Sequence, residues 1–186
     1  LAKAANTTPL AHDLQALLRA MVCGGAKSAI MEISSHALAL KRADDVQFDC
    51  AAFTNLQSDH MDFHKTRKNY FLAKARLFEL LAASPKKNKS AVINADDKMA
   101  PELMAMLPPG LSSFTFAVDG KADFKASSAQ ILEQKTLFNL DAPGGKASVS
   151  LKLLGLHNVY NALAAITAAC AMGVGLEAAV KGAEAL

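Results

Sequence analysis

The chain has 186 residues, of which 52% are hydrophobic and 20% are charged, and its formal net charge at pH 7 is +3. A chain of this length suits one globular domain with a substantial core, and its composition excludes an intrinsically disordered protein. The charge is mild and no basic stripe is interleaved with aromatic residues, which argues against nucleic-acid binding. A small positive excess does suit an anionic nucleotide ligand.

The lengths of the apolar runs and the positions of the cysteines exclude further classes of protein. The longest apolar run, 162–172, is well short of the roughly 20 residues that a membrane-spanning helix needs, so no membrane span is predicted. Cys23, Cys50 and Cys170 lie in apolar segments, and no two of them have the spacing of zinc ligands. We therefore predict buried thiols in a reducing compartment rather than a disulfide framework.

Helical repeats and short apolar runs alternate along the first part of the chain. We predict helices over 13–22, 66–83 and 97–107, and strands over 29–33, 48–54, 90–95 and 111–118. The helix over 66–83 is the clearest, because Thr66 is suited to cap its start and Pro85 lies beyond its end. This alternation is typical of a mostly parallel sheet flanked by helices.

The pattern changes after Gly120. Short segments over 124–132, 136–140 and 147–153 predict a small antiparallel subsheet. Two helices, over 158–172 and from 176 onward, are predicted to close the chain. The predicted fold class is therefore α/β, with a small antiparallel subsheet added to a mostly parallel sheet.

Polar residues directly follow two of the predicted strands, 32–36 after the first and 54–60 after the second. In open α/β sheets, ligands bind outside the carboxyl ends of the strands. Glu32 interrupts an apolar run, so its carboxylate should be paired or bound to a cation. With His60 it would suit Mg²⁺, which takes few protein ligands and keeps most of its waters. Alternatively, Glu32 caps a helix and His60 is an ordinary loop histidine.

Lys74 lies on the same predicted helical stripe as Tyr70, Phe78 and Leu81. A lysine on such a face commonly extends its amine to the surface. The alternative is a lysine in a cleft, with an amine that is chemically altered or paired with an anion.

Two further positions have two interpretations each. Thr7 and Thr8 precede the first predicted helix, where they would either help bind an anion or simply cap the helix. Asn158 opens a later helix, where it would cap the helix or hydrogen-bond a nucleotide.

In their order and spacing, these segments resemble the Mur ligases, and within that family the muramyl-tripeptide synthetases (MurE). The segments that carry the resemblance are 6–9 (NTTP), 31–38 (MEISSHAL), 53–56 (FTNL), 59–64 (DHMDFH), 70–74 (YFLAK) and 155–165 (GLHNVYNALAA). Each is weak evidence alone, but together they cover nearly the whole chain. The NTTP segment and the EISSH segment (32–36) favour the tripeptide synthetases over their sister ligases.

The resemblance implies a central domain of P-loop-NTPase-like fold in a bacterial cytoplasmic enzyme of peptidoglycan synthesis. Such an enzyme transfers the γ-phosphoryl group of ATP, with Mg²⁺, to the D-Glu carboxylate of UDP-MurNAc-L-Ala-D-Glu. The resulting acyl phosphate is attacked by an amine of meso-diaminopimelate or L-lysine, and an amide forms.

The resemblance also implies roles for individual residues. Four side chains would contact the UDP-MurNAc-dipeptide: Thr7, Thr8, Ser34 and Arg42. Glu32 and His60 would ligate Mg²⁺, and Asn158 would lie on the ATP side. Lys74 would be carbamylated and help to hold a second Mg²⁺, which makes Lys74 and His60 the expected catalytic residues. Carbamylation requires the neutral amine, which partial desolvation favours.

The chain departs from the family pattern at several points. Leu40 stands where some relatives carry a polar substrate contact, and His157 replaces the usual aromatic residue before Asn158. No phosphate loop is found, since Gly145-Lys146 is followed by alanine. We therefore expect residues 1–186 to be a fragment of the central domain without the phosphate loop, the N-terminal uridine domain and the C-terminal domain, and to be inactive alone.

Two other functions compete with this prediction. One is a sister ligase similar to folylpolyglutamate or cyanophycin synthetase, against which the NTTP and EISSH segments argue. The other is a non-catalytic module that has kept the fold, and the missing phosphate loop favours it if no such loop precedes this sequence in the gene.

Overall fold

The computed structural model describes residues 7–57 and 59–186. The chain divides into two compact units. Leu1–Gln47 with Ser58–Pro85 form one, called here the helical unit, and Phe48–Gln57 with Lys86–Leu186 form the other, called the sheet unit.

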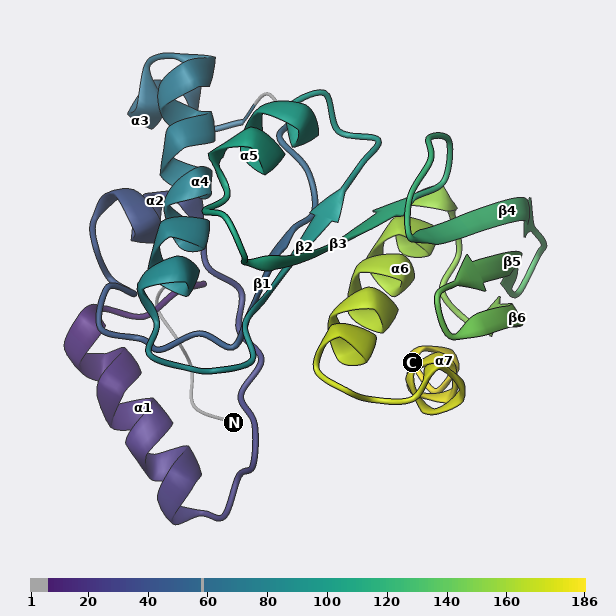
Figure 1. Ribbon diagram of the computed structural model, residues 1–186, viewed down its shortest axis with the longest axis horizontal. Coiled ribbons are helices and arrows are strands. Elements are labelled where there is room, and N and C mark those ends of the chain that lie inside the picture. Colours follow the sequence, from purple (N-terminus) through teal and green to yellow (C-terminus); the bar gives the residue numbers. More distant parts are fainter. Residues whose placement is uncertain (1–6, 58) are drawn as a thin grey trace. The chain divides into compact units, whose positions relative to one another are not determined.

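The sheet unit contains one six-stranded sheet whose strands lie in chain order (Figure 1). Its strands are β1 Cys50–Phe53, β2 Ser90–Asn94, β3 Ser112–Ala117, β4 Phe124–Ile131, β5 Thr136–Ala142 and β6 Gly145–Leu151. Strands β1 to β4 pair in parallel, and β4, β5 and β6 pair antiparallel. The predicted α/β fold with an antiparallel part is confirmed, and the parallel pairing of β4 with β3 makes both parts one continuous sheet.

Two helices cover this sheet, α6 (Leu156–Ala171) and α7 (Leu176–Glu184). Helix α6 packs across β2, β3 and β4, and α7 packs on β6 (Figure 1). Every residue of β2 is buried, whereas β5 alternates between buried and more exposed positions, as expected for a strand with one covered face. The largest buried side chains of this core include Phe116, Leu163 and Ile166.

The helical unit contains α1 (Ala11–Cys23), α2 (Ser35–Ala39), α3 (Met61–His64) and α4 (Arg67–Ala83). Helix α4 begins as predicted, because the Thr66 hydroxyl accepts a hydrogen bond from Asn69 N at 3.1 Å and so caps the first turn. Helices α2 and α3 pack on α4, which buries Phe71, Phe78 and Leu81.

The prediction of a buried strand over 29–33 is wrong. Among the described residues this segment forms no strand, and the side chain of Ile30 is fully exposed. An apolar run becomes a strand only where a neighbouring strand shares its backbone hydrogen bonds, and hydrophobicity alone does not supply that neighbour.

The predicted helix over 97–107 begins three residues late, as α5 (Ala100–Met106). The Asp97 carboxylate accepts a hydrogen bond from Met99 N at 2.8 Å, which stabilises a turn in place of a first helical turn. The other predicted helices and strands are confirmed, with ends shifted by no more than two residues, which is within the usual error for predicted element ends.

The three cysteines are unbonded, as predicted, but they are not all buried. Cys50 and Cys170 are half-buried, and burial, aided by the charge of Asp49, raises the pKa of the Cys50 thiol to about 11. Cys23 is exposed at the end of α1, so the prediction of burial is wrong for this residue. Within the described part of the chain, no helix is long and apolar enough to cross a membrane.

Candidate functional site

Thr8 joins segments of the helical unit that are far apart in the sequence. Its hydroxyl donates to the Glu32 carbonyl at 3.1 Å and accepts from Ser34 N at 3.0 Å, and its own carbonyl accepts from Arg42 Nη1 at 3.1 Å. The structure thus brings together three of the four residues predicted to contact the UDP-MurNAc-dipeptide. Thr8 is 1% exposed, whereas the fourth, Thr7, is exposed, and Asn6 of the same motif lies outside the described residues.

The helix-capping interpretation of Thr7 and Thr8 is wrong. The N-cap residue of α1 is Leu10, and among the described residues no side chain, neither Thr7 nor Thr8, forms a capping hydrogen bond to that helix. The Thr8 hydroxyl is instead used to fix the backbone on either side of Ile33.

The segment 34–36 is held from two sides. The Ser34 hydroxyl caps α2 by accepting from Ala37 N at 3.2 Å. The buried Ser35 hydroxyl lies 2.9 Å from Nε2 of His64, which is itself buried. A short helix is therefore fixed at its first turn by a cap and by a side chain from α3.

Five ring side chains, called here the histidine cluster, gather beside this segment: His36, His60, Phe63, His64 and Tyr70. His36 is the centre of the group, with its ring centroid 4.2 Å from Phe63, 4.7 Å from His60 and 5.5 Å from His64. Tyr70 lies 5.1 Å from His64 and 6.1 Å from His60.

The surroundings of the histidine cluster favour neutral rings at its buried side. Burial lowers the pKa of His64, and the neighbouring His36 and His60 lower it further, while Asp62 acts in the opposite direction. Burial, with the charge of Asp59, raises the pKa of the Tyr70 hydroxyl. His64 is therefore neutral near pH 7 and bonds Ser35 as an imidazole.

Lys74 lies on the face of α4 that carries Tyr70. Its amine is 5.3 Å from the centroid of the Tyr70 ring, within the range of a cation–π contact. Lys74 is half-buried, and Arg76 points elsewhere and pairs with Asp44 at 2.6 Å. The predicted stripe is confirmed, and the amine faces the histidine cluster.

Glu32 and His60, the predicted Mg²⁺ ligands, both have exposed side chains. Glu32 is exposed and lies in no strand, so burial does not require a partner for its carboxylate. Glu32 is also no helix cap, because Ser34 caps α2. His60 has a left-handed backbone (φ 59°). Among the described residues, no group of three or more His, Cys, Asp or Glu side chains is arranged to hold a metal ion.

The sheet unit has a polar network at the carboxyl ends of β1, β2 and β3 that the sequence reasoning missed. Asp96 accepts hydrogen bonds from Val118 N at 2.6 Å, Asp119 N at 2.9 Å, Gly120 N at 2.5 Å and the Tyr160 hydroxyl at 2.9 Å. The available signal was a pair of adjacent carboxylates, 96 and 97, directly after a predicted strand.

The neighbours of Asp96 extend the network to β1. Asn94 Nδ2 donates to the Thr54 carbonyl at 2.7 Å, and the Asp97 carboxylate accepts from Leu56 N, also at 2.7 Å. Burial alone would raise the pKa of Asp96, but its four hydrogen-bond donors outweigh burial and hold that pKa below its ordinary value. Asp96 is thus an anion that organises backbone amides.

Asn158 does not cap α6, so the capping interpretation is wrong. The helix begins at Leu156 after Gly155. Asn158 Nδ2 donates to the Leu154 carbonyl at 3.0 Å, and Asn161 Nδ2 donates to Asn158 Oδ1 at 3.1 Å. This pair orients the two carboxamides along the first turns of the helix.

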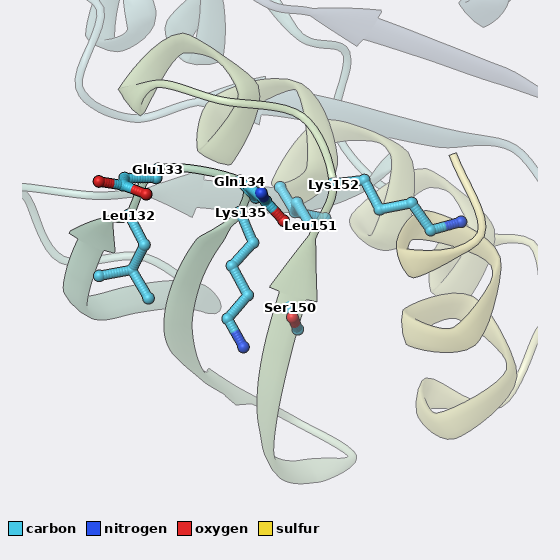
Figure 2. Close-up of a pocket in the computed structure, with 7 residues that line it drawn as sticks. All are labelled: Leu132, Glu133, Gln134, Lys135, Ser150, Leu151 and Lys152. Atoms are coloured by element: carbon cyan, nitrogen blue, oxygen red, sulfur yellow. The ribbon is translucent and has the colours of Figure 1, made fainter.

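A hollow of about 580 Å³ lies in the sheet unit (Figure 2). It is formed by the turn between β4 and β5 and by the end of β6, and its lining residues are Leu132, Glu133, Gln134, Lys135, Ser150, Leu151 and Lys152. None of the predicted site residues lines it.

The chain is an α/β protein, and polar side chains gather at the carboxyl ends of its parallel strands. In α/β proteins of this type, ligands bind at the carboxyl edge of the sheet. The Mur ligase middle domain family matches residues 1–169, and the chain belongs to this family.

Individual relatives agree with this assignment. The UDP-N-acetylmuramyl-tripeptide synthetase of Roseiflexus sp. (strain RS-1) is 42% identical over 180 residues, covering 92% of this chain and 35% of that protein. The UDP-N-acetylmuramoyl-L-alanyl-D-glutamate--2,6-diaminopimelate ligase of Synechococcus elongatus is 42% identical over 174 residues, covering 94% and 34%. The chain thus spans about a third of the length of the curated relatives it matches.

Solved structures give the same result. A structure of UDP-N-acetylmuramoyl-L-alanyl-D-glutamate--2,6-diaminopimelate ligase has a TM-score of 0.84 and 33% identity, covering 94% of this chain and 35% of that one. MurF from Acinetobacter baumannii has a TM-score of 0.69 and 29% identity, covering 77% and 30%.

Proposed function

We propose that this chain provides the middle domain of an ATP-dependent amide ligase that adds meso-diaminopimelate or L-lysine to UDP-MurNAc-L-Ala-D-Glu. One observation carries the proposal. Thr8 and Ser34, which belong to separate motif segments, and Arg42, which lies outside them, are joined by hydrogen bonds in a chain 42% identical to a tripeptide synthetase. The same likeness supports a complete enzyme with further domains, of which residues 1–186 are a part.

In this proposal the substrate's anionic end meets Arg42, whose planar guanidinium suits a carboxylate. Thr7 is exposed and Ser34 is half-exposed, so both are able to contact the precursor. Thr8 is buried and its hydroxyl bonds two backbone groups, so its part is to position Ser34 and Arg42.

The chemical difficulty of the reaction is charge, because a carboxylate must approach a polyanionic triphosphate. Bound Mg²⁺ would offset this repulsion, as is general for phosphoryl transfer. Glu32 and His60 would hold one Mg²⁺ and a carbamylated Lys74 would help to hold a second, and the accessible carboxylate and imidazole are donors that fit this ion. The Tyr70 ring stabilises a cation at Lys74, so we expect the carbamate to form only where metal ions supply positive charge.

The reaction then has two steps. The D-Glu carboxylate attacks the γ-phosphorus, ADP leaves, and an acyl phosphate forms. An amine of the diamino acid attacks the acyl carbon, phosphate leaves, and the amide remains after loss of a proton. Asn158, at the carboxyl edge of the sheet unit, would lie on the ATP side. The choice of diamino acid would be made outside this chain.

The test is phosphate release by the longer enzyme that contains this chain, given ATP, Mg²⁺ and UDP-MurNAc-L-Ala-D-Glu. We expect release only when meso-diaminopimelate or L-lysine is also added, and the active one names the second substrate. Mixtures without precursor and without amino acid are the controls. No release with either amino acid, from folded protein, would refute the proposal.

The same assay tests the two competing functions. A sister ligase similar to folylpolyglutamate synthetase would release phosphate with a folate and glutamate. The likeness to apo L. casei FPGS is 15% identity at a TM-score of 0.57, which supports a shared fold alone. A non-catalytic module would release phosphate with none of these substrates.

A further inference from the structure

Asp96 connects three parts of the sheet unit through one carboxylate. Its backbone follows β2, its oxygens bond the amides of Val118, Asp119 and Gly120 after β3, and the Tyr160 hydroxyl on α6 donates to it. The Lys125 amine donates to the Val118 carbonyl, so the segment after β3 is held from both sides. The carboxyl edge of the sheet is thereby fixed to a helix 64 residues further along the chain.

The pairing of the strands does not depend on Asp96. β2 and β3 are joined over five residue pairs, from Ser90 and Ser112 to Asn94 and Phe116. The core between the sheet and α6 is apolar and includes Phe116 and Leu163. The hydrogen bonds of Asp96 instead fix the loop after β3 and the start of α6.

Helix α6 has two polar attachments near its start. Gly155 N donates to the Thr136 hydroxyl at 3.1 Å, and Tyr160 donates to Asp96 at 2.9 Å. Asn158 lies between these two attachments, and its carboxamide is oriented by Asn161. Any shift of Tyr160 must therefore move the side chain that the proposed function puts on the ATP side.

We propose that Asp96 is a positioning residue for the nucleotide, acting through Tyr160 to hold the first turns of α6, and with them Asn158, in place at the carboxyl edge of the sheet. This inference rests on the proposed function for the identity of the nucleotide as ATP. It assigns a role to two residues that themselves touch no reacting atom.

The test compares steady-state kinetics of variants of the longer enzyme. Tyr160→Phe removes only the hydroxyl, so the three backbone amides still hold Asp96. We expect KM for ATP to rise about five- to tenfold, the effect of one lost hydrogen bond to a charged acceptor. We expect kcat and the KM for UDP-MurNAc-L-Ala-D-Glu to stay within about twofold, because Asn158 contributes to nucleotide binding alone.

Thr115→Val is the matched control. Thr115 lies on β3, and its hydroxyl donates to the Asp123 carboxylate at 2.7 Å, so the variant removes a hydroxyl–carboxylate bond that does not reach α6. We expect no change in KM for ATP. An equal rise in Thr115→Val, or an unchanged KM in Tyr160→Phe, would overturn the inference.

A double variant tests whether Asp96 acts through Tyr160. Asp96→Asn replaces one acceptor oxygen with a donor, so we expect a larger rise in KM than for Tyr160→Phe. Because both residues form one link, the double variant should be no worse than Asp96→Asn alone, and additive effects would contradict the inference.

Direct titration of the same variants with ADP separates this inference from the proposed function. If the enzyme releases no phosphate, but Tyr160→Phe weakens ADP binding and Thr115→Val does not, the positioning role stands and the ligase proposal falls. If all variants bind ADP as the unmodified enzyme does, the positioning role falls, whatever the outcome of the phosphate assay.

Discussion

The helical unit and the sheet unit fix their polar residues in different ways. In the sheet unit, Asp96 organises backbone amides at the ends of strands that are already paired. In the helical unit, short helices are joined by turns, and Lys41, His60 and Lys65 all have positive φ, whereas Ser128 is the one such non-glycine residue in the described sheet unit. Apart from Lys74, which lies within the regular helix α4, the predicted substrate and metal residues thus lie in irregular backbone, which is where proteins tend to store strain for function.

The largest effect should come from removing the amine that faces the histidine cluster. Lys74→Ala in the longer enzyme should lower kcat by about 10²- to 10³-fold, the cost of losing one charge-stabilising group in an active site. A small carboxylate added to the assay should restore part of the activity. Lys68→Ala, on the exposed first turn of the same helix, is the control and should be near normal. Near-normal turnover of Lys74→Ala would remove the carbamate from the proposed mechanism.

A smaller effect is expected in the sheet unit at Gly155. Its φ is 103°, and a Cβ there would lie 2.8 Å from the His157 ring, so alanine meets both strain and a side chain. Gly155→Ala should lower the free energy of unfolding by about 1–3 kcal/mol, measured by urea denaturation.

Gly182 provides the control for this substitution. It lies inside α7 with open space around its Cα, and Gly182→Ala should raise stability by about 0.5–1 kcal/mol. If both glycine variants changed stability alike, the start of α6 would not be the constrained point that the structure describes.

In both units, local signals decide which elements the sequence predicts well. Helix α4 and strand β2 were predicted almost to the residue, because the Thr66 cap and a continuous apolar run are local signals. The strand over 29–33 failed because a strand depends on a neighbour that no local pattern specifies. Within the helical unit, the segments of irregular backbone carry fewer local sequence signals from which their structure could be predicted.

The candidate site shows the same limit. Thr8, Ser34 and Arg42 were found through the family resemblance, since nothing in their local sequence joins them. The hydrogen bond between Asp96 and Tyr160 spans 64 residues, and only the fold brings the two side chains together. Two adjacent carboxylates after a predicted strand indicate a candidate polar site. They do not indicate which backbone amides will donate hydrogen bonds to them.

The smallest expected effect concerns the strain in the helical unit. Lys65 follows α3 with φ 64° and ψ −35°, which lies outside the small left-handed region open to residues other than glycine. Lys65→Gly relieves this strain, although it loses the amine's bond to the Asp62 carbonyl and gives the unfolded chain more freedom. The free energy of unfolding should rise by up to about 1 kcal/mol, as measured by urea denaturation. Lys68→Gly, in the first turn of α4, should lower it by up to about 1 kcal/mol. Destabilisation of similar size by both would show that residue 65 is not strained and would weaken the contrast between the two units.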